Sequence, residues 1–445
     1  MESIWSKTCK IRERRVLDRE IRTEVVIIGA GMSGILTAYQ LKKAGIQTVI
    51  LEAKRIGGGQ TKNTTAKITS QHGLFCDRFI QKKGEKAAGL YIQANQKAIE
   101  EYERIVREEN IPCDFEKTNS YVYSSDIRKL KNEVSAAEKL GVSASYIEYI
   151  EVPVACAGAV KFEKQAQFHP LKFISALSEE LEIYENSCVI EVEDNIVRTE
   201  KGAVTADQIV FATHYPFVNF PGLYFTRMHQ ERSYVLALEN AGNIEGVYIG
   251  DGEESYSFRN YQQYTLLGGK GHRTGENKAG NCYESLRRTA REWFPESREI
   301  AAWSAQDCIT PDQIPFVGIY AKSKPNWFVA TGFNKWGMTS SMVAAMLLRD
   351  MICGTENPYA QTFSSSRFGI EEVPQILKDA AKSASGLTKS LFQVSNKKPP
   401  VCSHLGCQLA WNPDEKSWDC PCHGSRFDCE GNLLDGPAQR KISHE

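Results

Sequence analysis

Two pairs of metal-binding residue types lie close together near the C-terminal end of the sequence. Cys402 and His404 form the first pair, and Cys420 and His423 form the second. In a mixed-ligand [2Fe-2S] cluster, two cysteines bind one iron and two histidines bind the other. A structural zinc ion also uses these ligands, but zinc modules usually pair cysteine with cysteine and histidine with histidine. Because each pair here holds one residue of each type, we favour the cluster, whose chemistry is the transfer of single electrons.

The strings around these residues resemble the two cluster-binding boxes of the Rieske family, CSHLGC at 402–407 and CPCHGS at 420–425. The resemblance implies iron ligation by the Cys-His pairs and a disulfide between Cys407 and Cys422. It also implies a hydrogen bond from Ser425 to a cluster sulfur, whereas Phe427 stands where a tyrosine donates a second one. Such bonds stabilise the reduced cluster, so we expect a reduction potential below that of respiratory Rieske centres.

A glycine turn near the N-terminus predicts a dinucleotide site. Residues 23–28 should form a buried strand, followed by Gly29-Ala30-Gly31-Met32-Ser33-Gly34 and a helix over 35–44. In this context the glycines let the backbone approach a pyrophosphate, whose charge is favoured at the helix N-terminus. A second strand over 47–51 ends at Glu52, which can accept hydrogen bonds from ribose hydroxyls. Three later segments, 55–73, 207–213 and 327–339, favour FAD over NAD.

Residues 24–368 resemble the FAD-dependent oxidoreductases of the D-amino-acid oxidase and glycine/sarcosine oxidase family. The resemblance rests on GAGMSG at 29–34, ATH at 212–214, TPDQIPFVG at 310–318 and GFNKWGMTSS at 332–341. The whole chain resembles bacterial members that carry a C-terminal Rieske domain. These motifs and the resemblance together give the expected FAD contacts: Gly29, Gly31, Met32, Ser33, Gly34, Glu52, Ala53, Arg55, Thr64, Thr65, Ala66, Lys67, Val189, Ala212, Thr213, Gly332, Gly337, Met338 and Thr339.

The expected fold class is α/β, with a Rossmann-like FAD-binding domain, an interleaved α+β substrate domain and a small all-β Rieske module. An N-terminal extension covers 1–23, and the oxidoreductase covers 24–368. Its FAD-binding segments are 24–83, 152–225 and 300–368, and its substrate segments are 84–151 and 226–299. A linker helix over 369–398 precedes the module at 399–445, whose base strands we expect to be missing or very short.

The resemblance implies oxidation of an amine or amino-acid-like substrate, with electrons passing from reduced flavin to the cluster. Arg259 is the best candidate to bind a substrate carboxylate, because a guanidinium matches it with two hydrogen bonds. Lys335 is a weaker candidate, as are three residues of the 226–299 segment, Arg232, Tyr234 and His272. We name no catalytic base, because the cofactor does the difficult chemistry. The alternative is an electron-transfer protein that serves a protein partner and has no small-molecule substrate.

Covalent attachment of the flavin would need a suitably placed cysteine. Cys308 lies nearer to Thr310-Pro311-Asp312 than the pattern of covalent sarcosine oxidases expects, so we predict noncovalent FAD.

The amino-acid composition argues against nucleic acid and membranes as binding partners. A net charge of -1 gives no electrostatic footprint for nucleic acid or anionic membranes. No run approaches the roughly 18 apolar residues of a membrane helix. Cysteines outside the cluster motif are scattered, which fits free thiols and a cytoplasmic location. The sequence does not name the electron acceptor.

Overall fold

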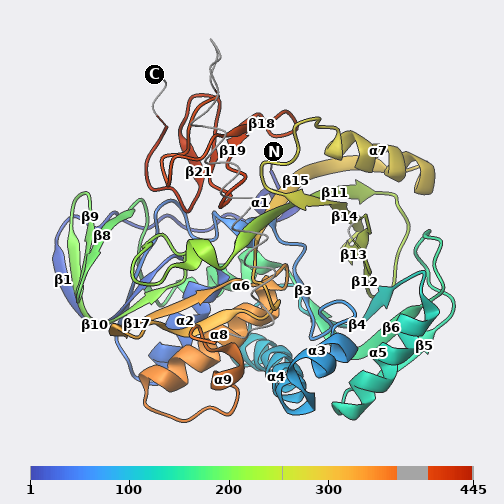
Figure 1. Ribbon diagram of the computed structural model, residues 1–445, viewed down its shortest axis with the longest axis horizontal. Coiled ribbons are helices and arrows are strands. Elements are labelled where there is room, and N and C mark those ends of the chain that lie inside the picture. The colour runs from blue at the N-terminus through green and yellow to red at the C-terminus, as the bar shows by residue number, and fades with distance from the viewer. Residues whose placement is uncertain (1, 253, 368–398, 443–445) are drawn as a thin grey trace.

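The computed structural model describes residues 2–252, 254–367 and 399–442. Two sheets lie beside each other, helices pack below and between them, and a small C-terminal module sits above (Figure 1). The expected linker helix at 369–398 lies outside the described residues.

The first sheet has eight strands in the order β16-β17-β10-β1-β2-β7, with β9 paired to β10 and β8 paired to β9. Strands β17, β10, β1, β2 and β7 run parallel. Residues Val25 to Ile28 of β1 are all buried, as expected for a parallel strand covered on both faces. Helix α2 packs against α8. The bounds are β1 Glu20–Ile28, β2 Thr48–Leu51, β7 Glu182–Tyr184, β8 Val189–Glu193, β9 Ile196–Thr199, β10 Ala203–Phe211, β16 Phe316–Ala321, β17 Lys324–Thr331, α2 Met32–Lys43 and α8 Gly337–Ile352.

The second sheet has nine strands in the order β15-β11-β14-β13-β12-β4-β6-β3, with β5 paired to β6. Alternating side chains of such a sheet point to opposite faces, which matters for the site below. The bounds are β3 Lys67–Ile68, β4 Glu116–Tyr123, β5 Ala144–Ile147, β6 Ala159–Gln167, β11 His229–Glu239, β12 Val247–Gly250, β13 Ser257–Tyr261, β14 Tyr264–Arg273 and β15 Arg298–Ile309.

This topology corrects the expected domain boundaries. Strands β3, β6 and β15 fall in segments assigned to the FAD-binding domain, yet they belong to the second sheet. Strand β15 pairs with β11 from His229↔Ile309 to Glu239↔Arg298. Such pairing is non-local, so the residues of β15 alone do not reveal it.

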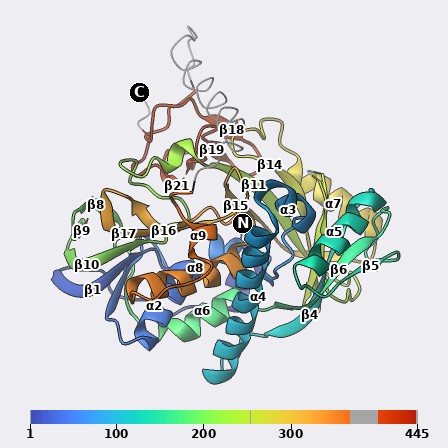
Figure 2. The same ribbon diagram turned by 60° about the horizontal axis from the view of Figure 1, so that its bottom comes forward.

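The helices gather mainly below the sheets, and Figure 2 shows the long α4 near α8 and α9. Near the N-terminus, the buried Trp5 of α1 donates from Nε1 to the Thr64 carbonyl at 2.7 Å, so the extension is part of the body. None of the helices in the described ranges is long and apolar enough to cross a membrane. The remaining bounds are α1 Ile4–Thr8, α3 Cys76–Lys83, α4 Glu85–Glu108, α5 Ile127–Lys139, α6 Pro170–Ser178, α7 Cys282–Trp293, α9 Ala360–Phe363 and the 3-10 helices η1 Gln60–Asn63 and η2 Tyr224–Thr226.

Residues 399–442 form the terminal module. Its four strands pair antiparallel in sequence order: β18 Ala410–Asn412, β19 Ser417–Asp419, β20 Arg426–Phe427 and β21 Leu433–Asp435. Each of these strands has only two or three residues, and all of them follow the first box. The base strands that the sequence led us to expect as missing or very short would precede that box, so this expectation stays a prediction. The module's own core is small and includes the cysteines of both boxes, so its stability depends on cross-links or metal.

Candidate functional site

A cavity of about 1050 Å³ is lined by residues of both sheets and of the terminal module. On one side lie the glycine turn after β1 and the start of α8. On another lie β11, β14 and β15, and residues 433–436 of the module contribute a further part of the wall. This volume is at the upper end of ordinary ligand pockets, which suits a dinucleotide together with a small substrate.

The glycine turn brings backbone close to the cavity. Gly29 has a φ of +106°, and a Cβ there would lie 2.6 Å from the Ala212 carbonyl oxygen. A Cβ on Gly34 would lie 1.9 Å from the Gly29 carbonyl oxygen. Any larger residue at either position would push the turn away from β1 and β10. The turn therefore needs glycine for close packing as well as for ligand approach.

Glu52 stands at the end of β2, beside this turn. One carboxylate oxygen accepts a hydrogen bond from the Ala30 N–H at 2.8 Å, and the other accepts one from the Lys54 N–H at 2.9 Å. These bonds fix the carboxylate at the cavity wall. Burial nevertheless raises the pKa of Glu52 above its ordinary value.

Most of the residues expected to contact FAD line the cavity, and their contact with FAD stays a prediction. They are Gly29, Gly31, Met32, Ser33, Glu52, Ala53, Thr64, Thr65, Lys67, Val189, Ala212, Thr213, Gly337 and Met338.

The other expected contacts lie behind the cavity wall. Gly34 packs under the turn, and Gly332, with a φ of +73°, lies against Thr310. Arg55 pairs with Glu185, and the Thr339 hydroxyl donates to the Thr69 carbonyl at 3.0 Å. Ala66 gives its carbonyl to an arginine, described next. These residues pack behind the wall rather than form it.

Arg259, expected to bind a substrate carboxylate, does not line the cavity. Its guanidinium donates to the carbonyls of Thr65 and Ala66 at 2.8 and 2.7 Å and lies over the ring of Trp5. The side chain is 1% exposed, and burial lowers its pKa to about 9. The prediction that Arg259 binds a substrate carboxylate was wrong, because its guanidinium points into the protein and holds the 64–66 loop.

Charged residues cover the cavity face of β11 and β15. Strand alternation places His229, Glu231 and Ser233 on one side of β11, and Asp307 lies opposite Glu231 on β15. Lys335 Nζ pairs with Glu231 Oε2 at 2.7 Å. Burial alone would raise the pKa of Glu231, but His229 and Lys335 lower it to about 2. Lys335 was expected from its sequence motif, whereas Glu231 and Asp307 were not predicted as site residues.

Tyr234 and His272, also weaker candidates, lie together at the cavity, with Tyr234 Oη 3.0 Å from His272 Nε2. Another imidazole, His214, lines the cavity, and its buried Nε2 has no hydrogen-bond partner among the described residues. His214 follows the expected contacts Ala212 and Thr213 in the ATH motif, which was the only sequence signal for it. These groups make this wall polar.

In the terminal module, two loops of similar geometry present the Cys-His pairs. Cys402 N–H donates to the Cys407 carbonyl and Gly406 N–H to the Cys402 carbonyl. The second loop repeats both bonds, from Cys420 to Ser425 and from Gly424 to Cys420. The sequence repeat of the two boxes thus produces a structural repeat, with the potential ligands facing one another.

The ligand atoms of this site suit a cluster. The imidazole rings of His404 and His423 lie 5.1 Å apart at 90°, and both Nδ1 atoms are buried without a hydrogen-bond partner in the described ranges. Burial lowers the pKa of His404 to about 4 and of His423 to about 3, which keeps both rings neutral, as metal binding requires. A hydrogen bond between Cys402 and Cys420 lowers the pKa of Cys402. Unpartnered nitrogens beside paired thiols fit metal ligands.

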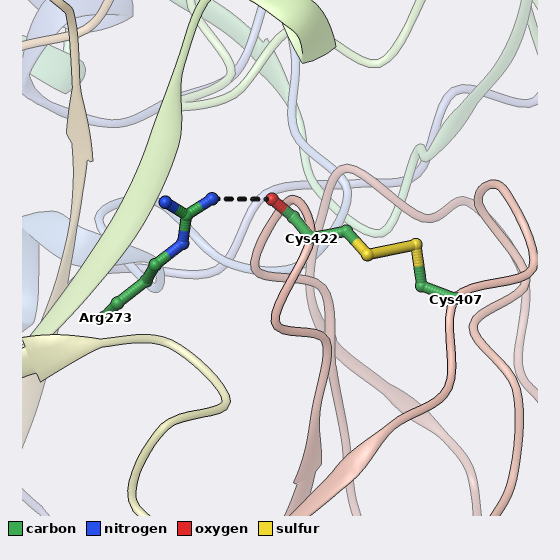
Figure 3. The surroundings of a disulfide bond; sticks show 3 residues. All are labelled: Arg273, Cys407 and Cys422. Carbon is green, nitrogen blue, oxygen red and sulfur yellow. Dashed lines mark hydrogen bonds between the residues drawn. A yellow bond between two sulfur atoms is a disulfide. The ribbon is translucent and has the colours of Figure 1, made fainter. Parts of the chain in front are cut away.

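A disulfide joins the two loops, as the resemblance implied. Cys407 and Cys422 are bonded with their Cα atoms 6.6 Å apart, and their sulfurs lie within 4.8 Å of Cys420 Sγ. Figure 3 shows Arg273 of β14 reaching toward this pair, where its guanidinium donates to the Cys422 carbonyl at 3.5 Å. The body of the protein thus contacts the loop that carries the disulfide.

Two glutamines connect the second cluster loop with the body. Gln230 of β11 donates to the His423 carbonyl at 2.7 Å, and Gln306 of β15 donates to the Gly424 carbonyl at 2.8 Å. Both side chains are almost fully buried. A Cβ on Gly424 would lie 2.6 Å from Gln230, so glycine is needed for this close contact.

A buried charge network fixes the module to the body a little further along. Arg232 of β11 pairs with Glu415, which also pairs with Arg426 of the module. Burial alone would raise the pKa of Glu415, but the two guanidinium groups lower it to about 2. Arg232 is therefore occupied in docking rather than in binding substrate.

Residues 24–351 match the family described as FAD dependent oxidoreductase. The chain belongs to this family. In this FAD-dependent oxidoreductase, residues 398–444 also match the Rieske [2Fe-2S] domain, so its cofactors are FAD and a [2Fe-2S] cluster.

Similar proteins support this combination of an oxidoreductase domain and a Rieske domain. The FAD-dependent oxidoreductase is 35% identical to the putative Rieske 2Fe-2S iron-sulfur protein YhfW of Bacillus subtilis, over 99% of this chain and 97% of that protein. It superposes on L-proline dehydrogenase from P. horikoshii with a TM-score of 0.67 and 17% identity, over 78% of this chain and 98% of the other. Glycine oxidase from Geobacillus kaustophilus gives a TM-score of 0.66 and 17% identity, over 78% and 99%. At this identity the two structures show a shared fold.

Proposed function

We propose that this protein oxidises an amine or amino-acid-like substrate at its flavin and passes the electrons one at a time to the Rieske cluster of the same chain. The observation that carries the proposal is the contact of Gln230 with the His423 carbonyl, because β11 also forms a wall of the cavity. One pair of strands thus separates the two redox sites. The names of the structural neighbours, a proline dehydrogenase and a glycine oxidase, support the substrate class.

The residues divide the work between two sites. Backbone of the 29–33 turn receives the pyrophosphate, Glu52 receives the ribose, and the N-terminus of α8 favours negative charge on the flavin ring. Cys402, His404, Cys420 and His423 hold the cluster. Bound flavin supplies the conversion between a two-electron donor and a one-electron cluster. Gln230 and Gln306, both almost fully buried, lie between the two sites.

The test is anaerobic reduction of the holoprotein by a panel of amines and amino acids. Flavin bleaching is followed by absorbance, and cluster reduction by electron paramagnetic resonance of frozen samples. We expect at least one amine to bleach the flavin and then to produce the signal of the reduced cluster. A His423→Ala variant, which keeps the FAD site, should show the bleaching without the cluster signal.

Two outcomes would contradict the proposal. If no amine bleaches the flavin but a reduced ferredoxin does, the protein is an electron carrier for a protein partner. If an amine bleaches the flavin while the intact cluster stays oxidised, the two cofactors do not exchange electrons.

A further inference from the structure

Two carboxylates face each other across β11 and β15 on the cavity side. Glu231 and Asp307 are register partners of the antiparallel pair, and both line the cavity. Directly opposed residues in such a pair have Cβ atoms about 5 Å apart, and like charges at this distance destabilise the sheet. The arrangement therefore calls for compensating positive charge.

The nearby cations compensate only part of this charge. Lys335 pairs with Glu231 at 2.7 Å, and His229 lies 3.4 Å from the same carboxylate. Arg232 points to the other face and pairs with Glu415. For Asp307, the described residues provide no side-chain hydrogen bond or ion pair. One carboxylate of the opposed pair is thus left facing the cavity.

The charge state of Asp307 follows from its surroundings. Burial raises its pKa to about 6, with Glu231 acting in the same direction and Lys335 and Arg232 opposing. The carboxyl is therefore mostly ionised at neutral pH, and it is half-buried at the cavity wall, where it would attract a cation. A positively charged ligand would offset the cost of burying the Asp307 carboxylate. It would also offset the repulsion between Asp307 and Glu231.

We propose that Asp307, supported by Glu231, binds a positively charged nitrogen of the substrate. The substrate is then a cationic amine that this wall recognises by its ammonium group. This inference rests on the proposed function and narrows it, because Arg259 does not reach the cavity and Arg232 is already paired. Asp307 acts as a specificity-determining residue, and the hydrogen bonds of its carboxylate orient the nitrogen.

Ligand binding to the oxidised holoprotein tests the inference without turnover. The probes are n-butylammonium and n-butyrate, which have the same chain length and opposite charge, and binding is followed by the flavin difference spectrum at pH 8. We expect n-butylammonium to bind and n-butyrate to bind more weakly. In Asp307→Asn, loss of a charged hydrogen bond should raise the Kd for n-butylammonium at least about tenfold.

The controls separate charge from folding. Asp307→Glu keeps the charge and should retain tighter n-butylammonium binding than Asp307→Asn. Asp207→Asn removes an exposed carboxylate of β10 and should leave the Kd unchanged. Flavin content and thermal unfolding confirm that each variant folds.

The inference is overturned if n-butyrate binds the parent protein more tightly than n-butylammonium, or if Asp307→Asn leaves the n-butylammonium Kd unchanged. Should amines still bleach the flavin in that case, the proposed function stands and only the cation site is lost. If n-butylammonium binds in an Asp307-dependent manner but no amine bleaches the flavin, the cation site stands and the proposed function fails.

Discussion

Gln230 and Glu231 are adjacent in β11 but serve opposite faces of the sheet. The Gln230 amide donates to the His423 carbonyl at 2.7 Å, while the Glu231 carboxylate pairs with Lys335 in the cavity at 2.7 Å. Strand alternation thus puts one residue at the cluster loop and its neighbour at the cavity wall. A small displacement of β11 at the cavity would therefore also move the residue that contacts the cluster loop.

The cluster ligands can be tested against a cysteine of the same module. Cys402→Ser and His423→Ala should each lose iron and acid-labile sulfide and lower the thermal stability of the module, because metal binding contributes to folding in so small a unit. Cys429 is exposed and free, so Cys429→Ser should keep full iron and sulfide content. Retention of the cluster in Cys402→Ser would contradict the ligand assignment.

Ser425 should tune the cluster potential. Its side chain hydrogen-bonds to Cys402, and its oxygen also accepts from the Ala438 N–H at 3.0 Å. Removing a donor to cluster sulfur destabilises the reduced state, so Ser425→Ala should lower the reduction potential in a redox titration. The parent protein should itself titrate below respiratory Rieske centres, because Phe427 has no hydroxyl. A potential that is unchanged in Ser425→Ala would argue against this hydrogen bond.

Glu415 should be essential for docking of the module. Glu415→Gln leaves Arg232 and Arg426 without their shared buried partner, which should cost about 3–5 kcal/mol. Thermal unfolding and limited proteolysis measure the loss. The exposed pair Arg22–Asp207 provides the control, since Asp207→Asn should change stability by no more than about 1 kcal/mol.

The same carboxylate predicts a pH dependence of docking. Glu415 has a folded pKa of about 2 against an ordinary value of 4.5, so its contribution is fully present above about pH 4.5. It is lost as the pH falls toward 2. Glu415→Gln should therefore flatten the stability profile in this acid range. An unchanged slope would show that Glu415 does not carry the dependence.

The close glycine contact should be required for the flavin site. Gly34→Ala would place a Cβ 1.9 Å from the Gly29 carbonyl oxygen, and we expect the purified variant to lose most of its FAD, measured by the flavin-to-protein absorbance ratio. Gly89→Ala in α4 is the matched control, because its Cβ would meet only Leu140 at 3.9 Å and alanine favours helices.

The flavin should be bound without a covalent link to the protein. In the parent protein, acid precipitation should therefore release all the flavin. Flavin bound to the pellet would contradict noncovalent attachment.

Affinity for n-butylammonium should depend on pH through Asp307. Its pKa of about 6 means that the carboxylate is charged above this pH and protonated below it. Glu231, whose pKa is lowered to about 2, stays ionised between pH 5 and pH 8. The Kd should therefore rise as the pH falls through 6 in the parent protein, and Asp307→Asn should show little change over this range.

Local motifs predicted many residues of this site. The direction in which strand residues point was much harder to predict from the sequence. The Cys-His boxes and the GAGMSG turn each lie within one short segment, so spacing alone identified the residues. Arg259 and Asp307 lie on strands whose facing depends on pairing with β14 and β11. No local pattern shows which of two alternating faces meets a cavity. For the same reason the sequence placed β15 in the wrong domain.

Residues of the body lie against both histidines of the cluster site. Phe225 lies edge-on to the rings of His404 and His423, and His404 Nε2 is 2.8 Å from Asn219 Oδ1. The body thus covers the imidazoles once the module is in place. We expect iron and sulfide to reach the site more easily before this closure than after it. We therefore expect cluster delivery to precede domain closure in the assembly of the chain.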